Sequence, residues 1–535
     1  MKAASCIGLA VLTAGVLLVY GAKLDHTPPD LHRDEVVFAL QAQSIASTGR
    51  DVDGRRLPLY FRMSTLGDDI WFCPVLVYVT AAFLKVLPLS EIVVRLPSVG
   101  IGALNVVLIF FLARLLFDDD RWAFFSAAML AMTPAHIIHS RLAFDFIYPL
   151  PFVLTWLICL AHYVRRPRPW LLFLSTSCLG LGVYSYIASV IMMPVYLALT
   201  AAILYAASVR SRRAYAIALA GFAWPLALLV PWIALHPAFV TDTLGRYSIG
   251  GFRHIGAPDG GRSALDMLRG IAAGARPANI AQRMSIYWTF FDPSYLFIYG
   301  GYTRLTNSTR HAGLFLLPLI VFVPLGIGHV LAQRRSPIAV LILLGFVLAP
   351  LAACLAAMDP YASDRELAVL PFGVVLATYG VERLLAVRAP WGRRAAIALV
   401  ALAPLHFLFF EVDYFTDYHR RSAFWFDWNH RGGVEEILAR VAHDERPILL
   451  SSSRDTVMES YWRFAALKHR RADLLQRPVY FDWQHVEIAS LPPRSLILAT
   501  RNDAPLIAAA ESGALRRLVD IPEPGDPPYF VVLER

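Results

Sequence analysis

The sequence predicts an α-helical polytopic membrane protein with about 11 spans and a small α/β domain outside the membrane at the C-terminus. Hydrophobic residues make up 57% of the 535 positions and charged residues only 17%. Ordinary soluble domains have about 45–50% apolar and 25% charged residues. Long apolar runs recur up to residue 411, and short arginine-rich tracts separate several of them. Together these features predict a chain that crosses a bilayer many times.

Each predicted span is an apolar run close to the roughly 20 residues that cross a bilayer. The spans are predicted at residues 3–22, 95–117, 122–139, 146–164, 170–185, 188–208, 215–235, 313–332, 337–357, 367–387 and 394–411. The run 71–89 is interrupted by Pro74, Lys85 and Pro88. We therefore expect it to lie along the membrane interface, although a twelfth span would also fit its length.

Basic tracts orient these spans. They follow the fourth, sixth, eighth and tenth spans, at Arg165–Arg168, Arg210–Arg213, Arg334–Arg335 and Arg388–Arg394. Short cytoplasmic connections are rich in Lys and Arg, so the N-terminus is predicted inside. The first span is expected to be an uncleaved anchor because no A-x-A-like site follows it. The prediction is a transmembrane module over 1–411 with outward loops 23–94 and 236–312, and an extracytoplasmic domain over 412–535.

The C-terminal segment has a different pattern. A helical stretch at 434–445 precedes four short apolar runs, PILLSSS, PVYFDW, SLILAT and YFVVLER, which are typical of buried strands. No Walker-type loop and no GxGxxG occurs, so nucleotide-driven transport has no support. The formal net charge of +9 is explained by the basic tracts, and no nucleic-acid partner is expected. The five cysteines show no CxxC spacing and imply neither disulfides nor a cysteine zinc site.

Ionisable residues gather directly after the first span. They are Asp25, His26, Asp30, His32, Arg33, Asp34 and Glu35, and an apolar-periodic segment follows them. Ionisable groups this close to lipid are costly and tend to be functional when they face a cavity. The alternative is a solvated helix cap, with Asp34 at a helix N-terminus where a carboxylate is favourable.

A second carboxylate, Asp145, lies among apolar and aromatic residues in HSRLAFDFIYPLPF. Its structural alternative is an ion pair with Arg141, one helical turn earlier. The functional interpretation is chemical. Activating a hydroxyl or amine acceptor requires a carboxylate base, and an anionic phosphate leaving group requires a cation or a metal.

The second outward loop is rich in arginine. Between residues 237 and 312 it has no Lys or Glu but eight Arg and four Asp, namely Arg246, Arg253, Arg262, Arg269, Arg276, Arg283, Arg304, Arg310, Asp242, Asp259, Asp266 and Asp292. The planar guanidinium group matches phosphate oxygens. The alternative for these arginines is a merely solvated basic loop, and the alternative for the aromatic residues of the same loop is anchoring at the membrane interface. Arg365 lies at the outer end of the tenth span. It is interpreted either as a phosphate ligand or as a snorkelling anchor, and the neighbouring Asp364 and Glu366 could neutralise its charge in a structural ion pair.

Several of these stretches, taken in order, form a familiar pattern. They are the Asp34-Glu35 pair, the stretch SEIVVRLPSVGIGALNVVLIFFLARLLF, Asp145, and FFDPSYLFIYGG followed by Arg310-His311. This order resembles the GT-C superfamily of membrane glycosyltransferases, nearest the dolichyl-phosphate-mannose protein mannosyltransferase and lipid A aminoarabinose transferase branch. The resemblance covers most of residues 1–390.

The resemblance implies roles for specific residues. Asp34 would be the principal catalytic carboxylate, with Glu35 beside it and Asp145 as a second acidic group. The donor phosphate would be bound by Arg365 with Arg304 and Arg310, and acceptor or sugar contacts are expected from His311, Tyr295 and Tyr299. Some members use a divalent metal, for which His26 and His32 are the candidate ligands. The chain departs from the pattern where WFCPVL replaces a His-Pro-Pro or Lys-Pro-Pro motif, and where Glu366 replaces an aromatic residue.

The leading hypothesis is transfer of a sugar from a polyprenyl-phosphate donor to a protein, lipid or glycan acceptor on the outer face of a membrane, in the setting of a bacterial inner membrane. A transporter or lipid-linked sugar flippase is the main alternative. Transporters place ionisable residues near the bilayer midplane, whereas here they cluster in the outward loops. A sensor or scaffold built around the C-terminal domain ranks third. The expected partners are the lipid-linked donor, the acceptor and membrane lipids.

Overall fold

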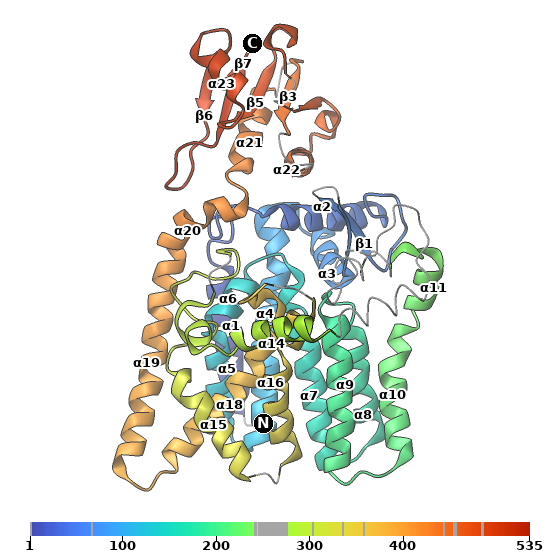
Figure 1. Cartoon of the computed structure of the whole chain (residues 1–535), viewed down its shortest axis with the longest axis vertical. Helices are drawn as coiled ribbons and strands as arrows, with labels where there is room; N and C mark the ends of the chain where they lie inside the picture. The colour runs from blue at the N-terminus through green and yellow to red at the C-terminus, as the bar shows by residue number, and fades with distance from the viewer. Residues whose placement is uncertain are drawn as a thin grey trace. The chain divides into compact units, whose positions relative to one another are not determined.

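A computed structural model gives the arrangement of the chain (Figure 1). It describes residues 3–65, 68–239, 243, 276–301, 304–333, 336–356, 359–441, 445–452, 457–482 and 486–535. The chain forms two compact units. The first comprises Met1–Ala22, Trp71–Leu76 and Ser98–Asp413, and the second comprises Lys23–Ile70, Val77–Pro97 and Tyr414–Arg535. The C-terminal segment thus folds as one unit with most of the first outward loop, which the sequence assigns to the transmembrane module.

The first unit is helical, and two of its helices extend into the second unit, α4 over Glu91–Pro97 and α19 over Tyr414–Phe415. Its helices are α1 (Ala3–Gly21), α4 (Glu91–Phe117), α5 (Asp120–Ala131), α6 (Pro134–Ser140), α7 (Pro149–Arg165), α8 (Pro169–Gly182), α9 (Ser189–Ala206), α10 (Arg212–Leu226), α11 (Leu229–Leu235), α14 (Pro277–Thr289), α15 (Leu319–Gln333), α16 (Pro337–Leu348), α17 (Leu351–Ala356), α18 (Val369–Leu385) and α19 (Pro390–Phe415). Among the described residues, seven helical stretches are long and apolar enough to cross a membrane, and three shorter apolar helices accompany them. The chain is therefore an integral membrane protein.

Every predicted span coincides with helix, but several predicted spans are interrupted. The run 122–139 divides into α5 and α6 in front of Pro134, and the run 337–357 divides into α16 and α17. Proline lacks the N–H that would continue a helix and disfavours helical geometry before it, which explains the first break. The run 71–89 contains α3 (Pro74–Leu84), whose 11 residues would extend about 16 Å, roughly half of a hydrocarbon core.

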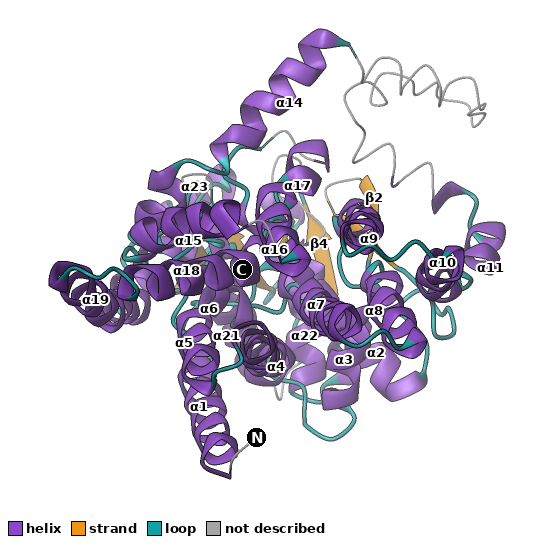
Figure 2. Cartoon of the chain, turned by 90° about the horizontal axis from the view of Figure 1, so that it is seen from below, coloured by secondary structure: helices purple, strands orange, loops and turns teal. Residues whose placement is uncertain are grey.

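Glycines allow two of these helices to approach closely. A Cβ added at Gly326 of α15 would lie 1.8 Å from the Leu376 carbonyl oxygen, and one at Gly380 of α18 would lie 1.9 Å from the Phe322 carbonyl oxygen. Figure 2 shows α15 and α18 side by side. Small residues at such contacts let helix backbones pack together where lipid offers no hydrophobic drive.

The second unit contains the predicted α/β domain. Its helices and strands are α2 (Arg33–Thr48), β1 (Phe61–Thr65), β2 (Asp68–Phe72, shared with the first unit), α20 (Asp417–Ser422), α21 (His430–Arg440), β3 (Ile448–Ser451), α22 (Val457–Lys468), β4 (Pro478–Phe481), β5 (Leu496–Thr500), α23 (Ala504–Glu511), β6 (Arg516–Asp520) and β7 (Phe530–Glu534). The five-stranded sheet has the order β4-β3-β5-β7-β6. β3 pairs in parallel with β4 and β5, whereas β7 is antiparallel to β5 and β6.

All four predicted strands are present, and β6 is an addition. β5 lies in the middle of the sheet with all five residues buried, and its Ile497 and Ala499 pack with Leu506 of α23 and Leu533 of β7 in the core. β6 reads RRLVD and is largely exposed at the sheet edge. A charged edge strand lacks the apolar run that the sequence analysis required, and such charge protects an edge from pairing with other chains.

Candidate active site

The acidic cluster after the first span leads into helix α2. His32 is the N-cap residue, and Arg33, Asp34 and Glu35 form the first turn. The backbone N–H of Asp34 donates to His32 Nδ1 at 3.2 Å, and the backbone N–H of His32 donates to Glu35 Oε2 at 2.9 Å. This reciprocal pair is a capping box, which satisfies donors that a helix start leaves open. His32 is therefore the N-cap residue, while Asp34 lies at the helix N-terminus as the alternative interpretation expected, in the first turn.

Glu35 is fully buried and forms an ion pair with Arg95 near the start of α4. Arg95 Nε donates to Glu35 Oε1 at 3.0 Å and Nη2 donates to Oε2 at 2.9 Å. The remaining Arg95 donors reach the carbonyl oxygens of Leu24 at 2.9 Å, Pro28 at 3.0 Å and Asp30 at 2.6 Å. A buried charge is tolerated when such partners surround it. Arg95 therefore holds the loop before α2 at both ends.

Asp34, the adjacent residue, has a different environment. Its side chain is 38% exposed. Among the described residues, the one ionisable group within 4 Å of its carboxylate is the His32 ring, whose Nδ1 lies 3.7 Å from Oδ2. A carboxylate at the first turn of a helix is stabilised as an anion by the exposed N–H groups and the helix dipole. Asp34 thus combines an accessible carboxylate with a backbone that is fixed on both sides.

The two candidate metal ligands, His26 and His32, have different neighbours. His26 stacks on His419 with ring centroids 4.2 Å apart. It lines an open cavity of about 700 Å³ with Asp30, Arg431 and Lys468 among the other lining residues. Burial raises the pKa of Asp30 to about 6, although Arg431 and Arg95 act to lower it. In the part of the chain that is described, neither histidine belongs to a group of three metal-ligand side chains.

Asp145 begins a short 3-10 turn, Asp145–Ile147, directly before α7. The residue is buried, and the rings of Phe144 and Phe146 beside it stack with centroids 4.9 Å apart. Arg141, the alternative partner, is also buried and donates to the carbonyl oxygens of Val19, Tyr20 and Ala22 at the end of α1. Asp145 is therefore a carboxyl in an aromatic setting at a helix start.

Arg365 ends the short turn Ser363–Arg365, and its surroundings bear on whether its charge is available. Its Nε lies 3.6 Å from Asp364 Oδ2, and its Nη2 lies 4.0 Å from Asp359 Oδ2. Glu366 is buried and accepts a hydrogen bond from the Tyr295 hydroxyl. Burial raises the pKa of Glu366 well above its usual value, so this carboxyl is held neutral. Of the two acidic neighbours in sequence, Asp364 rather than Glu366 balances Arg365.

The structure brings the segment around residue 300 against Arg365. Asn307 Nδ2 donates to Asp364 Oδ1 at 3.2 Å, and the ring of Tyr361 lies 5.3 Å from that of Tyr295. Arg304 is exposed and acts electrostatically on Asp364, lowering the pKa that burial raises. Tyr295 is fully buried, whereas Tyr299 is partly exposed and better placed for a ligand contact.

Arg310 is the third predicted phosphate ligand. Arg310 adopts a left-handed backbone with φ 61° and donates its backbone N–H to Ser308 Oγ. It lies partly buried, one residue before His311. Arg246, Arg253, Arg262 and Arg269 lie outside the described residues.

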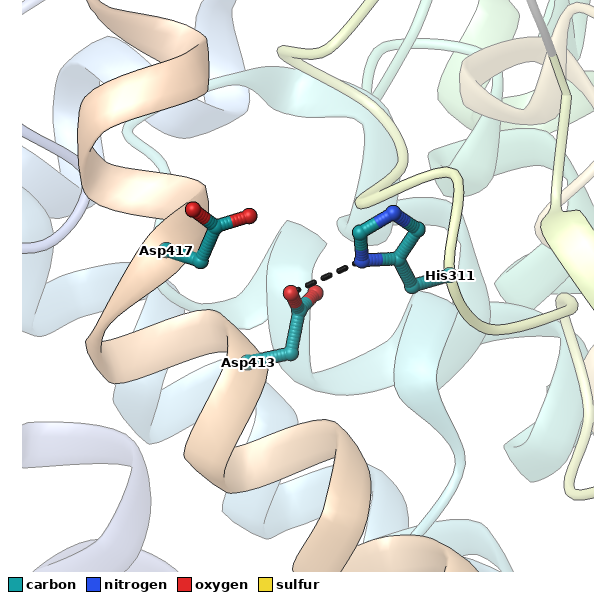
Figure 3. A group of neighbouring side chains, drawn as sticks. All are labelled: His311, Asp413 and Asp417. Carbon is teal, nitrogen blue, oxygen red and sulfur yellow. Dashed lines mark hydrogen bonds and ion pairs between the residues drawn. The ribbon is translucent and has the colours of Figure 1, made fainter.

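His311 pairs with a carboxylate that the sequence analysis missed (Figure 3). Its Nδ1 lies 2.9 Å from Oδ1 of Asp413 on α19, and the His311 side chain is 48% exposed. A carboxylate that binds one ring nitrogen orients the imidazole and leaves Nε2 for a ligand or a metal.

Two further partners also escaped the sequence analysis. Arg95 is a cation within an apolar run, which signals a buried partner without naming Glu35. Asp427 binds Arg33 through its carboxylate, but the two residues are 394 positions apart. No local pattern could connect such distant residues.

The chain is similar to known proteins in sequence and in fold. Residues 73–234 match the family model for dolichyl-phosphate-mannose-protein mannosyltransferase. The fold is similar to the crystal structure of ArnT from Cupriavidus metallidurans bound to undecaprenyl phosphate, with TM-score 0.54 and 13% identity, covering 100% of this chain and 98% of that chain. The predicted resemblance is therefore confirmed as a likeness of fold, over the whole length of the chain.

Two other solved structures are less similar. Archaeal oligosaccharyltransferase AglB from Archaeoglobus fulgidus, in complex with an inhibitory peptide and a dolichol-phosphate, has TM-score 0.49 and 13% identity, covering 90% of this chain and 65% of that chain. The S. cerevisiae protein O-mannosyltransferase Pmt1-Pmt2 complex bound to the sugar donor has TM-score 0.34 and 17% identity, covering 46% of this chain and 36% of that chain. Among curated proteins, none matches the sequence.

Proposed function

We propose that this chain is a GT-C type glycosyltransferase that transfers a sugar from a polyprenyl-phosphate carrier to a protein, lipid or glycan acceptor on the outer face of a bacterial inner membrane. The observation that carries the proposal is the accessible Asp34 carboxylate on a helix start fixed by a capping box and the buried Glu35–Arg95 pair. A reacting group on rigid support is the usual arrangement of a catalytic site. The family match and the ArnT-like fold support the same reaction class.

The acceptor half of the reaction is assigned to Asp34. An acceptor hydroxyl or amine attacks the anomeric carbon of the sugar, and the new bond forms as the bond from that carbon to the carrier phosphate oxygen breaks. The acceptor proton passes to the Asp34 carboxylate, and the bonding electron pair leaves with the phosphate. Attack opposite the leaving group inverts the anomeric centre. General base catalysis of this kind contributes about 100- to 10,000-fold in rate.

The donor half is assigned to Arg365 with Arg304 and Arg310. Negative charge on the phosphate increases as the glycosidic bond breaks, so a cation there stabilises the transition state more than the bound donor. Arg365 suits this role because Glu366 is bound by Tyr295 and held neutral. Asp145 is proposed as a second acidic group. His311 and Tyr299, both at least partly exposed, are proposed contacts for acceptor or sugar.

The test is a comparison of envelope glycans and lipids by mass spectrometry in cells with and without the gene, and with Asp34→Asn. We expect one glycosylated species to disappear in the deletion, to return with the wild type, and to fall at least 100-fold with Asp34→Asn. Asp520→Asn is the matched control, since this carboxylate is 40% exposed on β6 and pairs only with Arg517 in the described chain. Wild-type product levels with Asp34→Asn would refute the catalytic assignment.

A further inference from the structure

The start of α2 is bound by a residue from the C-terminal part of the second unit. Asp427 lies in the turn before α21, and its side chain is 7% exposed. Its Oδ2 accepts the backbone N–H of Arg33 at 2.9 Å, and its Oδ1 accepts Arg33 Nε at 2.9 Å and also Nη2. Arg33 is therefore fixed at both its backbone and its side chain. Since Arg33 directly precedes Asp34, Asp427 also holds this guanidinium group away from the neighbouring carboxylate.

The same carboxylate faces His32. The Nδ1 atom of His32 accepts the Asp34 N–H at 3.2 Å, and its Nε2 lies 3.9 Å from Asp427 Oδ2. The His32 ring therefore lies between the carboxylates of Asp34 and Asp427. The guanidinium of Arg33, in contrast, is bound by Asp427. A carboxylate without a cation beside it is a stronger base.

A second contact secures the loop just before the helix. The Tyr461 hydroxyl of α22 donates to the Leu31 carbonyl oxygen at 2.6 Å. The ring of His430 stacks on Tyr461 with centroids 4.4 Å apart, and its Nδ1 bonds the Asp427 carbonyl oxygen. Burial lowers the pKa of His430 to about 4, so this ring is neutral at pH 7 and stacks without a charge.

The turn that carries Asp427 is itself well supported. Asp427 and Trp428 have φ of 62° and 59°, a left-handed conformation that is uncommon outside glycine. Trp428 stacks on Tyr529 with ring centroids 4.9 Å apart, and Arg501 lies over the Trp428 ring at 5.0 Å. Residues keep such a conformation when the surrounding structure overdetermines it.

We infer that Asp427 is a positioning residue for Asp34, through which the C-terminal α/β domain keeps Arg33 from pairing with the catalytic carboxylate. The inference rests on the proposed function. It assigns to the domain a direct part in turnover, separate from folding. Loss of Asp427 would release Arg33, whose guanidinium could then pair with the adjacent Asp34 and weaken it as a base.

The experiment compares Asp427→Asn with Glu534→Gln in the full-length protein. Glu534 pairs with Arg446 and Arg516 in the same sheet domain. Product is measured by mass spectrometry in complemented deletion cells, and purified protein is tested for thermal stability and for binding of undecaprenyl phosphate. We expect Asp427→Asn to lower product at least tenfold, to bind undecaprenyl phosphate within twofold of wild type, and to melt close to Glu534→Gln, which keeps normal product.

A second variant separates positioning from loss of structure. Asp427→Asn combined with Arg33→Met removes the released cation, so product should rise at least threefold above that of Asp427→Asn alone. No rise in the double variant, or normal product with Asp427→Asn, would overturn the inference. Asp34→Asn in the same cells distinguishes the two proposals. If that variant keeps activity the proposed function fails, and if it is inactive while Asp427→Asn is normal only the positioning role fails.

Discussion

Neutralising Glu35 should destabilise the protein far more than neutralising Asp34, its neighbour. In Glu35→Gln the amide keeps the size of the side chain and its place in the capping box, because Gln also serves at this position. What it removes is the negative charge that faces Arg95. Both side chains are at most 1% exposed, so no water replaces the lost partner.

The structure sets the size of the effect. Arg95 keeps its contacts to the carbonyl oxygens of Leu24, Pro28 and Asp30 but loses its counter-charge. Breaking a buried ion pair by removing one partner costs about 3–5 kcal/mol. At about 2–4 °C per kcal/mol for a unit of 150–250 residues, we expect the melting temperature to fall by roughly 6–20 °C.

The assay is thermal unfolding of the purified protein in one detergent, followed by fluorescence. Glu436→Gln is the control, because Glu436 pairs with Arg440 at the surface of α21, where each side chain is about one-third exposed. Such surface pairs contribute at most about 1 kcal/mol. Asp34→Asn should melt near the wild type. A Glu35→Gln protein that melts within 2 °C of the wild type would contradict this expectation, and so would an Asp34→Asn protein that loses as much stability as Glu35→Gln.

Three other outcomes follow from the structure. Arg365→Lys should weaken undecaprenyl phosphate binding at least tenfold, because a point charge cannot reproduce the guanidinium fork. The control is Arg383→Lys, at the exposed end of α18, which should leave binding unchanged. Equal binding by both variants would favour Arg365 as a snorkelling anchor. Burial raises the pKa of Asp30 from 3.8 to about 6 on folding. The protonated carboxyl therefore contributes fully to stability below pH 3.8, and this contribution is lost as the pH rises through 6. Asp30→Asn should therefore stabilise the protein at pH 8 by at most about 3 kcal/mol and raise its melting temperature there, whereas at pH 4 it should give no such gain. An equal rise in melting temperature at both pH values would contradict this expectation. A phosphatase that works only outside the cytoplasm should be active when it is fused to Arg535, because the C-terminus is predicted to lie outside. An inactive fusion whose C-terminus lies in the cytoplasm would contradict the predicted topology.

Periodic and compositional features were predictable because they act locally. A run of about 20 apolar residues predicts a span whatever lies elsewhere in the chain, and each predicted run proved helical. The strands of the C-terminal sheet were recognisable where they are buried, as at β5, and not where they lie at the edge, as at β6. The break before Pro134 has a local cause too, because the proline that interrupts the helix is visible in the sequence.

The candidate site divides in the same way. The sequence by itself determined that acidic residues gather after the first span and that a helix follows them, because composition and helix periodicity are written in neighbouring residues. Only the tertiary structure decided that Glu35 is buried against Arg95 while Asp34 remains accessible, since successive residues of a helix face different directions. The partners that set these fates lie 60 positions away at Arg95 and, for Arg33, 394 positions away at Asp427. Contacts over such separations form only when the chain packs, and a local pattern carries no record of them.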